Sequence, residues 1–150
     1  MSFTVTETHR TFTADARYRP ILVLTSNSEK NLPDAFLRRC VYYHIPFPGE
    51  KRLQEIVERR LPRDSIFASR IIENAIKEFV RIRSTLDLIK PPATAELIGW
   101  ARILRVLEID LGNLKPGQVE SVIMSYSVLA KTKEDLELMQ RQVPVAAQKQ

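Results

Sequence analysis

Two basic side chains and one amide are the strongest candidates for chemistry in this sequence. Arg38 and Arg39 are adjacent, and a guanidinium presents a planar fork of N–H donors that matches the oxygens of a phosphate group. Asn27 closely follows a short apolar run at 21–24. Open α/β sheets collect ligands beyond the carboxyl ends of their strands, where an amide can hold a water or a phosphate oxygen. These residue types therefore indicate phosphate chemistry.

Each of these residues also has an ordinary structural explanation. Paired arginines at the end of a short helix complement its dipole, and Asn27 suits a turn that follows a strand. Nucleophilic catalysis has little support, because Ser26 does not lie in a G-x-S-x-G elbow. Cys40 has only His44 as a nearby partner on the same strand parity, so we expect it to be a core or edge thiol.

The elements that must position these residues follow one another in a definite order. The run 21–24 is short, β-branched and preceded by a proline, which predicts a buried strand. A turn at 32–34 leads into a short helical segment, 35–37, that ends in the paired arginines. A second strand is predicted at 41–45, and the prolines of 46–48 close it.

This order of elements resembles the second half of an AAA+ ATPase core, with its closest likeness in the MoxR-like group. The resemblance rests on the TSN tip after the first strand and on the segment LPDAFLRRC after the loop. It implies that Asn27 is the sensor 1 residue. It also implies that Arg39 is the arginine finger, with Arg38 as its neighbour. A finger is supplied to the nucleotide of an adjacent subunit, so a homo-oligomeric ring is implied as well.

The resemblance covers only the C-terminal half of such a module. A P-loop needs glycines whose backbone N–H groups cradle phosphates, followed by Lys and Ser or Thr. No glycine of this chain stands in that motif, and Glu108 and Asp110 do not form an adjacent pair of acids after a strand. ATP and Mg²⁺ are therefore expected in the complete module. We expect this chain alone neither to bind them tightly nor to hydrolyse ATP, whether it is a truncated form, a split gene product or a degenerate subunit.

The first residues predict a β-hairpin. Phe3, Val5 and Phe12 alternate with threonines, and the polar middle at 7–10 supplies the turn. His9 lies in this turn without Cys, Asp or a second His at metal-binding spacing, so we expect no metal site.

After residue 48 the pattern becomes helical. Apolar stripes at helical spacing, stop signals and caps predict a bundle of four to five helices. Asp64 or Ser65 is expected to cap the second helix, and Thr132 with Asp135 forms a capping-box-like start for the last. Trp100 and Met124 are expected in the core. The expected helices are 50–61, 65–83, about 93–110, one that begins near 116 and carries its stripe to 129, and 132–141.

A helical bundle after an α/β core is similar to the lid domain of an AAA+ protein. In MoxR-like lids the third helix begins with the sensor 2 motif, where an arginine is expected. This chain has Pro92 at that position. Either Lys90 replaces the arginine from one turn earlier and contacts the nucleotide, or the sensor 2 charge is absent.

The fold class expected from these patterns is mostly α. Residues 1–48 are expected to form an α/β remnant, with an N-terminal hairpin and two core strands. Residues 49–142 are expected to form the all-α lid, and 143–150 a flexible tail.

Composition sets further limits on the kind of protein. In 150 residues, 44% are hydrophobic and 27% charged, which is typical of a chain with a real core. A single cysteine and the lack of an apolar run of about 20 residues favour a cytoplasmic protein without a membrane partner. The net charge of +5 is spread among interleaved acids, so nucleic-acid binding is not expected.

Two functions are therefore compared. The first is the C-terminal portion of a MoxR-like ATPase, which contributes sensor 1, a finger and the lid to a ring that remodels or assembles other proteins. The second is a non-enzymatic helical module that binds proteins or nucleic acid. A P-loop and Walker B acid in frame upstream of the chain would favour the first.

Overall fold

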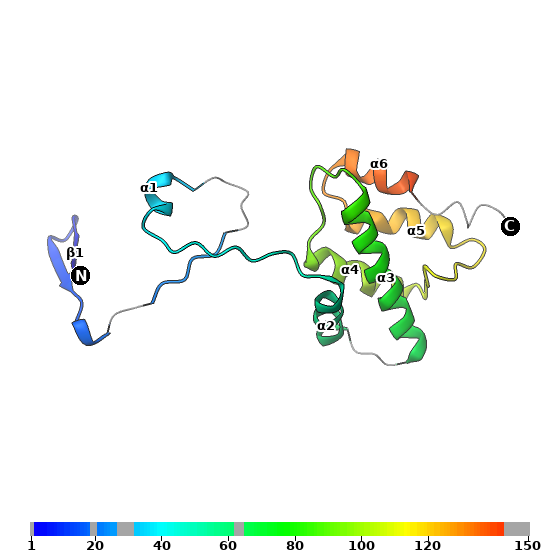
Figure 1. The fold of residues 1–150 in the computed structure, drawn as a ribbon, viewed down its shortest axis with the longest axis horizontal. Coiled ribbons are helices and arrows are strands. Elements are labelled where there is room, and N and C mark those ends of the chain that lie inside the picture. The colour runs from blue at the N-terminus through cyan, green and yellow to red at the C-terminus, as the bar shows by residue number, and fades with distance from the viewer. Residues whose placement is uncertain (1, 19–20, 27–31, 62–64, 143–150) are drawn as a thin grey trace. The chain divides into compact units, whose positions relative to one another are not determined.

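The computed structural model describes residues 2–18, 21–26, 32–61 and 65–142. The chain forms two compact units, residues 1–45 and 46–150 (Figure 1). The described residues contain six α-helices and one two-stranded sheet, so the chain is mostly α, as the sequence predicts. None of these helices combines the length and the apolar character that crossing a membrane requires.

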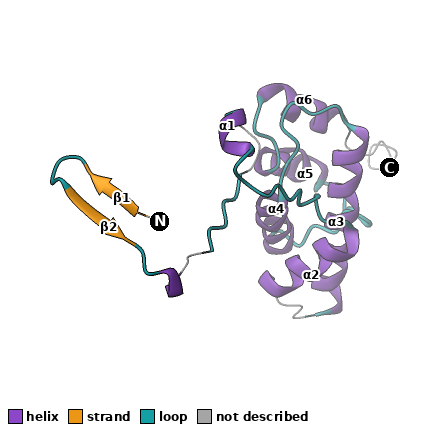
Figure 2. Cartoon of the chain, turned by 60° about the vertical axis from the view of Figure 1, so that its left-hand side comes forward, coloured by secondary structure: helices purple, strands orange, loops and turns teal. Residues whose placement is uncertain are grey.

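The predicted N-terminal hairpin is confirmed. Strands β1 (Ser2–Val5) and β2 (Arg10–Thr13) pair antiparallel and are joined by a short turn (Figure 2). Phe3 lies opposite Phe12, and their rings stack with centroids 5.2 Å apart. His9 ends the turn with a positive φ of 51°. Cross-strand aromatic pairs of this kind stabilise a hairpin that has no further strand beside it.

The two predicted core strands are wrong. Residues 21–24 and 41–45 have no strand partner in the structure, and their apolar side chains lie in solvent, with Ile21 92% and Val41 101% exposed. A strand exists only through hydrogen bonds to a neighbour. Among the described residues the single sheet is the hairpin, so neither segment has an edge to pair with.

Between these two segments the predicted short helix is present. Helix α1 (Asp34–Leu37) is a single turn, and the carbonyl of Pro33 accepts hydrogen bonds from the N–H groups of its last two residues. Earlier in the chain, a 3₁₀ turn (Ala16–Tyr18) follows Asp15, whose carboxylate binds the Arg17 side chain at 2.7 Å.

Residues 46–142 form a helical bundle around α3, the longest helix. Figure 1 shows α3 lying across the bundle, and it packs against both α2 and α4. A 3₁₀ turn (Tyr126–Val128) continues α5 and packs on α4 and α6. The helices are α2 (Glu50–Arg60), α3 (Ile66–Thr85), α4 (Thr94–Val106), α5 (Val119–Ser125) and α6 (Lys133–Arg141).

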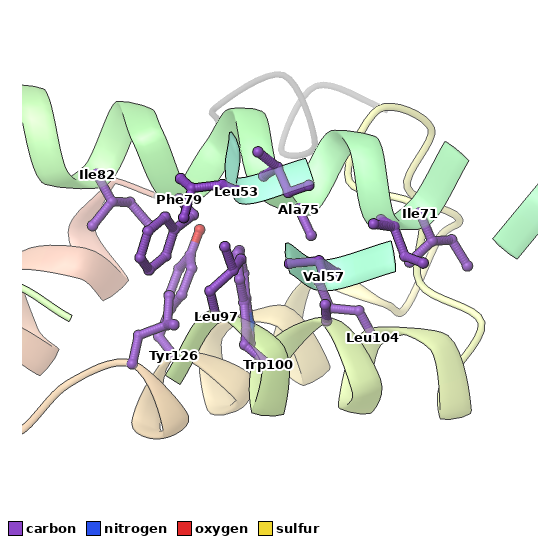
Figure 3. Packing of buried hydrophobic residues seen from close by; sticks show 14 of the residues in the cluster. Leu53, Val57, Ile71, Ala75, Phe79, Ile82, Leu97, Trp100, Leu104 and Tyr126 are labelled. Atoms are coloured by element: carbon purple, nitrogen blue, oxygen red, sulfur yellow. The ribbon is translucent and has the colours of Figure 1, made fainter. Parts of the chain in front are cut away.

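The bundle core is built from the predicted apolar stripes. Phe79, Trp100 and Tyr126 are fully buried, with aliphatic side chains of α2, α3 and α4 around them (Figure 3). The indole N–H of Trp100 donates to the hydroxyl of Ser125 at 2.8 Å, so its polar atom is satisfied inside the core. Each large apolar side chain buried in this way contributes roughly 1.5–3 kcal/mol.

Local signals placed several helix starts correctly. Ser65 caps α3 by accepting from the Ala68 N–H at 3.1 Å, and the alternative cap, Asp64, lies outside the described residues. Thr132 caps α6 by accepting from the Asp135 N–H at 3.1 Å. Both caps follow from a side-chain oxygen placed three residues before a free amide.

The predicted core position of Met124 and the predicted end of the third bundle helix near 110 are wrong. Met124 is 66% exposed, because it lies on the outer face of α5. Helix α4 ends at Val106 and not near Asp110, which leaves Leu107 47% exposed. Glu108 takes a positive φ of 51° there, and the Ile109 N–H closes onto an earlier carbonyl of the helix. Glycine usually supplies this left-handed geometry at a helix end, and here Glu108 adopts it.

Candidate functional site

The paired arginines lie at the C-terminal end of α1. Arg38 is its C-cap residue and Arg39 follows, and both side chains are exposed. The Arg39 guanidinium donates to the carbonyl oxygen of Ala35 in its own turn. Arg38 makes no side-chain hydrogen bond or ion pair with any part of the chain that the structure describes. Two guanidiniums are thus presented to solvent within one turn of helix.

The Arg39 contact is a weak restraint on that side chain. A hydrogen bond in full contact with water contributes only about 0.5–1.5 kcal/mol. An approaching phosphate, which offers several charged oxygens, is a stronger acceptor for the same N–H groups. Arg39 can therefore serve as a helix cap in the free chain and still be available to an anion. Asn27, the third predicted residue, lies outside the described residues.

Lys90, the fourth predicted site residue, lies in the loop between α3 and α4, and its side chain is exposed. The backbone of this loop is held by a buried carboxylate from α6. Asp135 accepts the Ile89 N–H at 2.8 Å and the Lys90 N–H at 3.0 Å, one with each oxygen. Since Asp135 also lies in the first turn of α6, the helix dipole stabilises its negative charge. The backbone that carries Lys90 is consequently fixed.

The end of the same loop is held by a second carboxylate. Glu96 accepts the Ala93 N–H at 3.0 Å, which satisfies a free amide at the start of α4. The other oxygen of Glu96 pairs with Lys131 at 3.2 Å. Both ends of the segment from Ile89 to Ala93 are thus tied to the bundle.

Sequence reasoning missed the residue that holds the middle of this loop, Arg83. Pro92 is buried, and the Arg83 guanidinium donates to its carbonyl oxygen. The guanidinium also lies over the ring of Phe47, 3.7 Å from its centroid, and 6.0 Å from the centroid of Phe79. Burial lowers the pKa of Arg83. Nothing in the sequence distinguished Arg83 from its basic neighbours, because its partners are remote along the chain.

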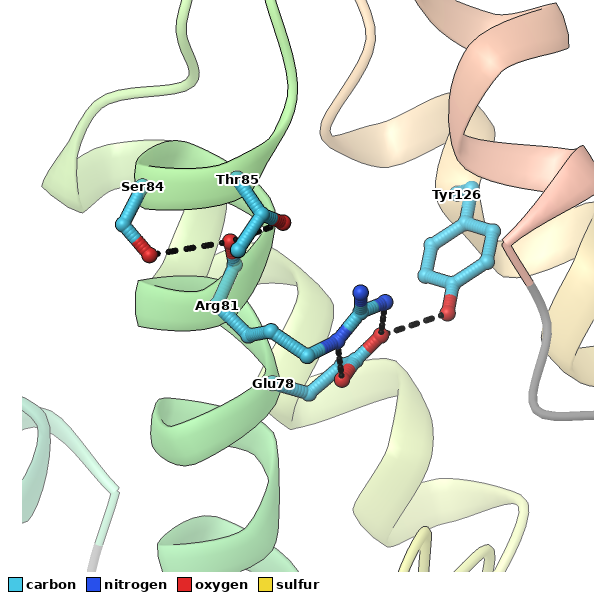
Figure 4. A network of polar contacts seen from close by, with 5 residues as sticks. All are labelled: Glu78, Arg81, Ser84, Thr85 and Tyr126. Atoms are coloured by element: carbon cyan, nitrogen blue, oxygen red, sulfur yellow. Dashed lines mark hydrogen bonds and ion pairs between the residues drawn. The ribbon is translucent and has the colours of Figure 1, made fainter.

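A neighbouring arginine on α3 has a different environment. Arg81 forms a two-pronged ion pair with Glu78, with both N–O distances 2.7 Å (Figure 4). The hydroxyl of Tyr126 donates to the same carboxylate at 3.1 Å. Burial, with the Glu78 charge, raises the pKa of Tyr126 far above its usual value. This network joins α3 to the end of α5, and within it each charge has a partner of opposite sign.

No cluster of three or more His, Cys, Asp or Glu side chains suited to a metal ion occurs within the described ranges. Cys40 is exposed, not in a core or at a sheet edge as expected. No protein-family model, no curated protein and no solved structure matches the chain.

Proposed function

We propose that this chain contributes sensor 1, a trans-acting arginine finger and a lid to ATP hydrolysis by a MoxR-like AAA+ ATPase. The complete protein would work as a ring that remodels or assembles other proteins. ATP and Mg²⁺ would bind chiefly to a P-loop half that this sequence does not contain.

The observation that carries the proposal is the contrast between the two units. Among the described side chains of residues 2–45 none is buried, although 21–24 and 41–45 are strongly apolar. Apolar runs of this length are favourable only when other elements cover them. Residues 46–142, in contrast, have a complete core of their own. Uncovered apolar segments followed by a bundle with its own core are what the C-terminal half of such an ATPase would present.

The position of the arginine pair also supports the proposal. A finger has to leave its own subunit and reach a γ-phosphoryl group, so its side chain must lie in solvent. Arg38 and Arg39 satisfy this requirement at the end of α1. In nucleotide hydrolases an arginine supplied to the transition state accelerates hydrolysis by about 10³–10⁵-fold.

The decisive experiment uses a protein in which a P-loop and Walker B half precedes residue 1. Arg39→Ala should leave folding and nucleotide binding nearly unchanged, while ATP hydrolysis by the assembled ring falls by roughly 10³-fold or more. Arg39→Lys should rescue poorly, because an ammonium lacks the planar fork. Arg60→Ala, which removes an exposed arginine at the end of α2, is the matched control. Phosphate release measures ATP hydrolysis, and circular dichroism measures folding.

Mixing subunits separates the finger from sensor 1. A subunit that lacks Arg39 but has an intact P-loop should recover activity beside a neighbour that has the finger and a dead P-loop. An Asn27→Ala subunit should not recover, since its amide would act on its own nucleotide. Unchanged hydrolysis in Arg39→Ala, or unfolding of that variant, would show that Arg39 is structural. Magnesium-dependent turnover by the present chain alone would also contradict the proposal.

A further inference from the structure

Residues 41–45 form an apolar run whose backbone has no partner. All five side chains are exposed, and no backbone group of the run is hydrogen-bonded to the described part of the chain. The run, VYYHI, consists largely of β-branched and aromatic residues, and it carries no charge while His44 is neutral. Residues of these types favour a strand, but a strand needs hydrogen bonds to a neighbour. The run therefore fits an edge that another chain supplies.

The two edges that this run would have as a strand differ in their hydrogen-bonding groups. Successive residues of a strand direct their N–H and C=O groups to opposite edges. Val41, Tyr43 and Ile45 would share one edge, and each of them has a backbone N–H. The opposite edge would include Pro46, which has no N–H and is tolerated where a strand edge faces solvent. Pairing should therefore use the edge of Val41, Tyr43 and Ile45.

The run is complementary to itself when two copies lie antiparallel about Tyr43. Tyr43 of one copy then faces Tyr43 of the other, and on either side Val41 faces Ile45. The side chains of these residues lie on one face of the pair, so aromatic and β-branched groups cover one another. Each facing pair can exchange both of its N–H···O hydrogen bonds, and no like charges face each other.

We propose that residues 41–45 pair with the same residues of a second copy of this chain, as an antiparallel two-stranded sheet centred on Tyr43. Both copies use the same edge, so the contact has two-fold symmetry and is closed. The outer edges carry Pro46, which opposes the addition of further strands. The assembly is accordingly a dimer and not a fibre.

The other exposed apolar run, 21–24, is a weaker candidate for this contact. It is one residue shorter and has no aromatic side chain, so it offers less surface to bury against a second copy. Its side chains are nevertheless exposed to a similar degree, with Val23 and Tyr43 both 81% exposed. Run 21–24 therefore supplies a control position for the experiment.

The pairing goes beyond the proposed function and does not rest on it. In a complete ATPase subunit, strands of the same subunit would cover 41–45. The dimer is a property of the 150-residue chain without such a cover, where these side chains lie in solvent.

The test is sedimentation of the whole chain over a range of concentrations, with a reductant present to keep Cys40 a thiol. A monomer–dimer equilibrium with a dissociation constant of roughly 0.1–1 mM is expected, because an isolated two-stranded sheet is only marginally stable. In a mixture of isotope-labelled and unlabelled chains, NMR should show contacts between Val41 of one copy and Ile45 of the other.

Charged substitutions at Tyr43 test the register. Tyr43→Asp and Tyr43→Arg each remove the central aromatic pair and place like charges opposite each other, so each should weaken dimerisation by roughly tenfold or more. An equimolar mixture of the two variants should dimerise again, because opposite charges then face each other. Val23→Asp is the matched control, since it adds the same charge at an equally exposed position. It should dimerise as the wild type does.

Several results would overturn the proposal. These are a monomer at millimolar concentration, an equal loss of dimerisation in Val23→Asp, no recovery in the mixture, or aggregates larger than a dimer. The variants should keep the thermal midpoint of the wild type, because neither Tyr43 nor Val23 packs in the core. Failure here would leave the finger hypothesis standing, because Arg39 is tested by hydrolysis in a ring. Conversely, unchanged hydrolysis in Arg39→Ala rings would not affect dimerisation of this chain.

Discussion

At the level of single residues, the environment of a side chain decides what its charge can do. Arg81 and Arg83 lie on the same helix two positions apart. The first is neutralised by Glu78, which also accepts the Tyr126 hydroxyl, so the three groups satisfy one another and join two helices. The second has an aromatic ring and a carbonyl as partners, neither of which carries a negative charge. Of these two arginines, only the first is therefore held by an ion pair within the bundle.

The buried tyrosine of this network predicts a loss of stability in base. Burial raises the pKa of Tyr126. Above about pH 10 the unfolded chain loses this proton while the folded chain retains it, so the free energy of unfolding falls as the pH rises. Tyr126→Phe should reduce this pH dependence, although losing the hydrogen bond to Glu78 should cost roughly 1–2 kcal/mol at neutral pH. Urea unfolding at a series of pH values, from neutral into the alkaline range, measures both effects.

Tyr43→Phe is the control for this experiment, because the Tyr43 ring is 81% exposed and packs in no core. It should leave the pH dependence of unfolding as in the wild type. If the free energy of unfolding of Tyr126→Phe falls with pH as steeply as that of the wild type, Tyr126 does not cause the loss of stability in base.

At the level of elements, α6 holds the backbone of the loop between α3 and α4 in place. Asp135 reaches from the first turn of α6 and accepts two consecutive amides, and Leu88 beside them is buried. A fully buried carboxylate is tolerated only when such donors satisfy it. The last helix therefore determines the loop conformation, although about 45 residues separate them in the sequence.

Replacing this carboxylate should free the loop without unfolding the bundle. Asp135→Ala removes both acceptors and should cost roughly 2–4 kcal/mol, because two amides lose a charged partner. Hydrogen exchange of the Ile89 and Lys90 amides should then become fast relative to amides in the middle of α3. Asp87→Ala, an exposed acid in the same loop, should change neither stability nor exchange. Preserved protection in Asp135→Ala would contradict the assigned role.

At the level of the whole molecule, the two units differ in what stabilises them. Among the residues that the structure describes, the buried ones all belong to 46–142, and the side chains of 2–45 have no core. Phe47 belongs to the bundle, because its ring packs near Phe79 and under Arg83. The stability of the chain should therefore come from the bundle alone.

A fragment of residues 46–150 should accordingly fold by itself. Its thermal midpoint should lie within a few degrees of that of the full chain, since deleting 1–45 removes no buried side chain from the bundle core. A shorter fragment that begins at Gly49 also loses Phe47, and it should be less stable by roughly 1–2 kcal/mol. Calorimetry of the three proteins checks this order. A 46–150 fragment that fails to fold would show that the first unit stabilises the second.

The sequence by itself determined the local structure of this protein. Helical periodicity, the caps at Ser65 and Thr132 and the alternation around Phe3 and Phe12 predicted helices and a hairpin that the structure contains. These signals work because the interacting atoms lie within about four residues of one another along a helix, or face each other across one short turn. The same local signals placed two arginines at an exposed helix end.

The tertiary structure alone decided the features that depend on remote partners. Residues 21–24 have the composition of a strand, but the described part of the chain offers no neighbour to pair with. Met124 was expected in the core, yet it lies on a side of α5 that stays exposed. The contacts of Arg83 and Asp135 join segments far apart in the sequence, and no spacing rule connects them. Burial and charge compensation are properties of the packed molecule, because they depend on which distant groups the fold brings within a few ångströms.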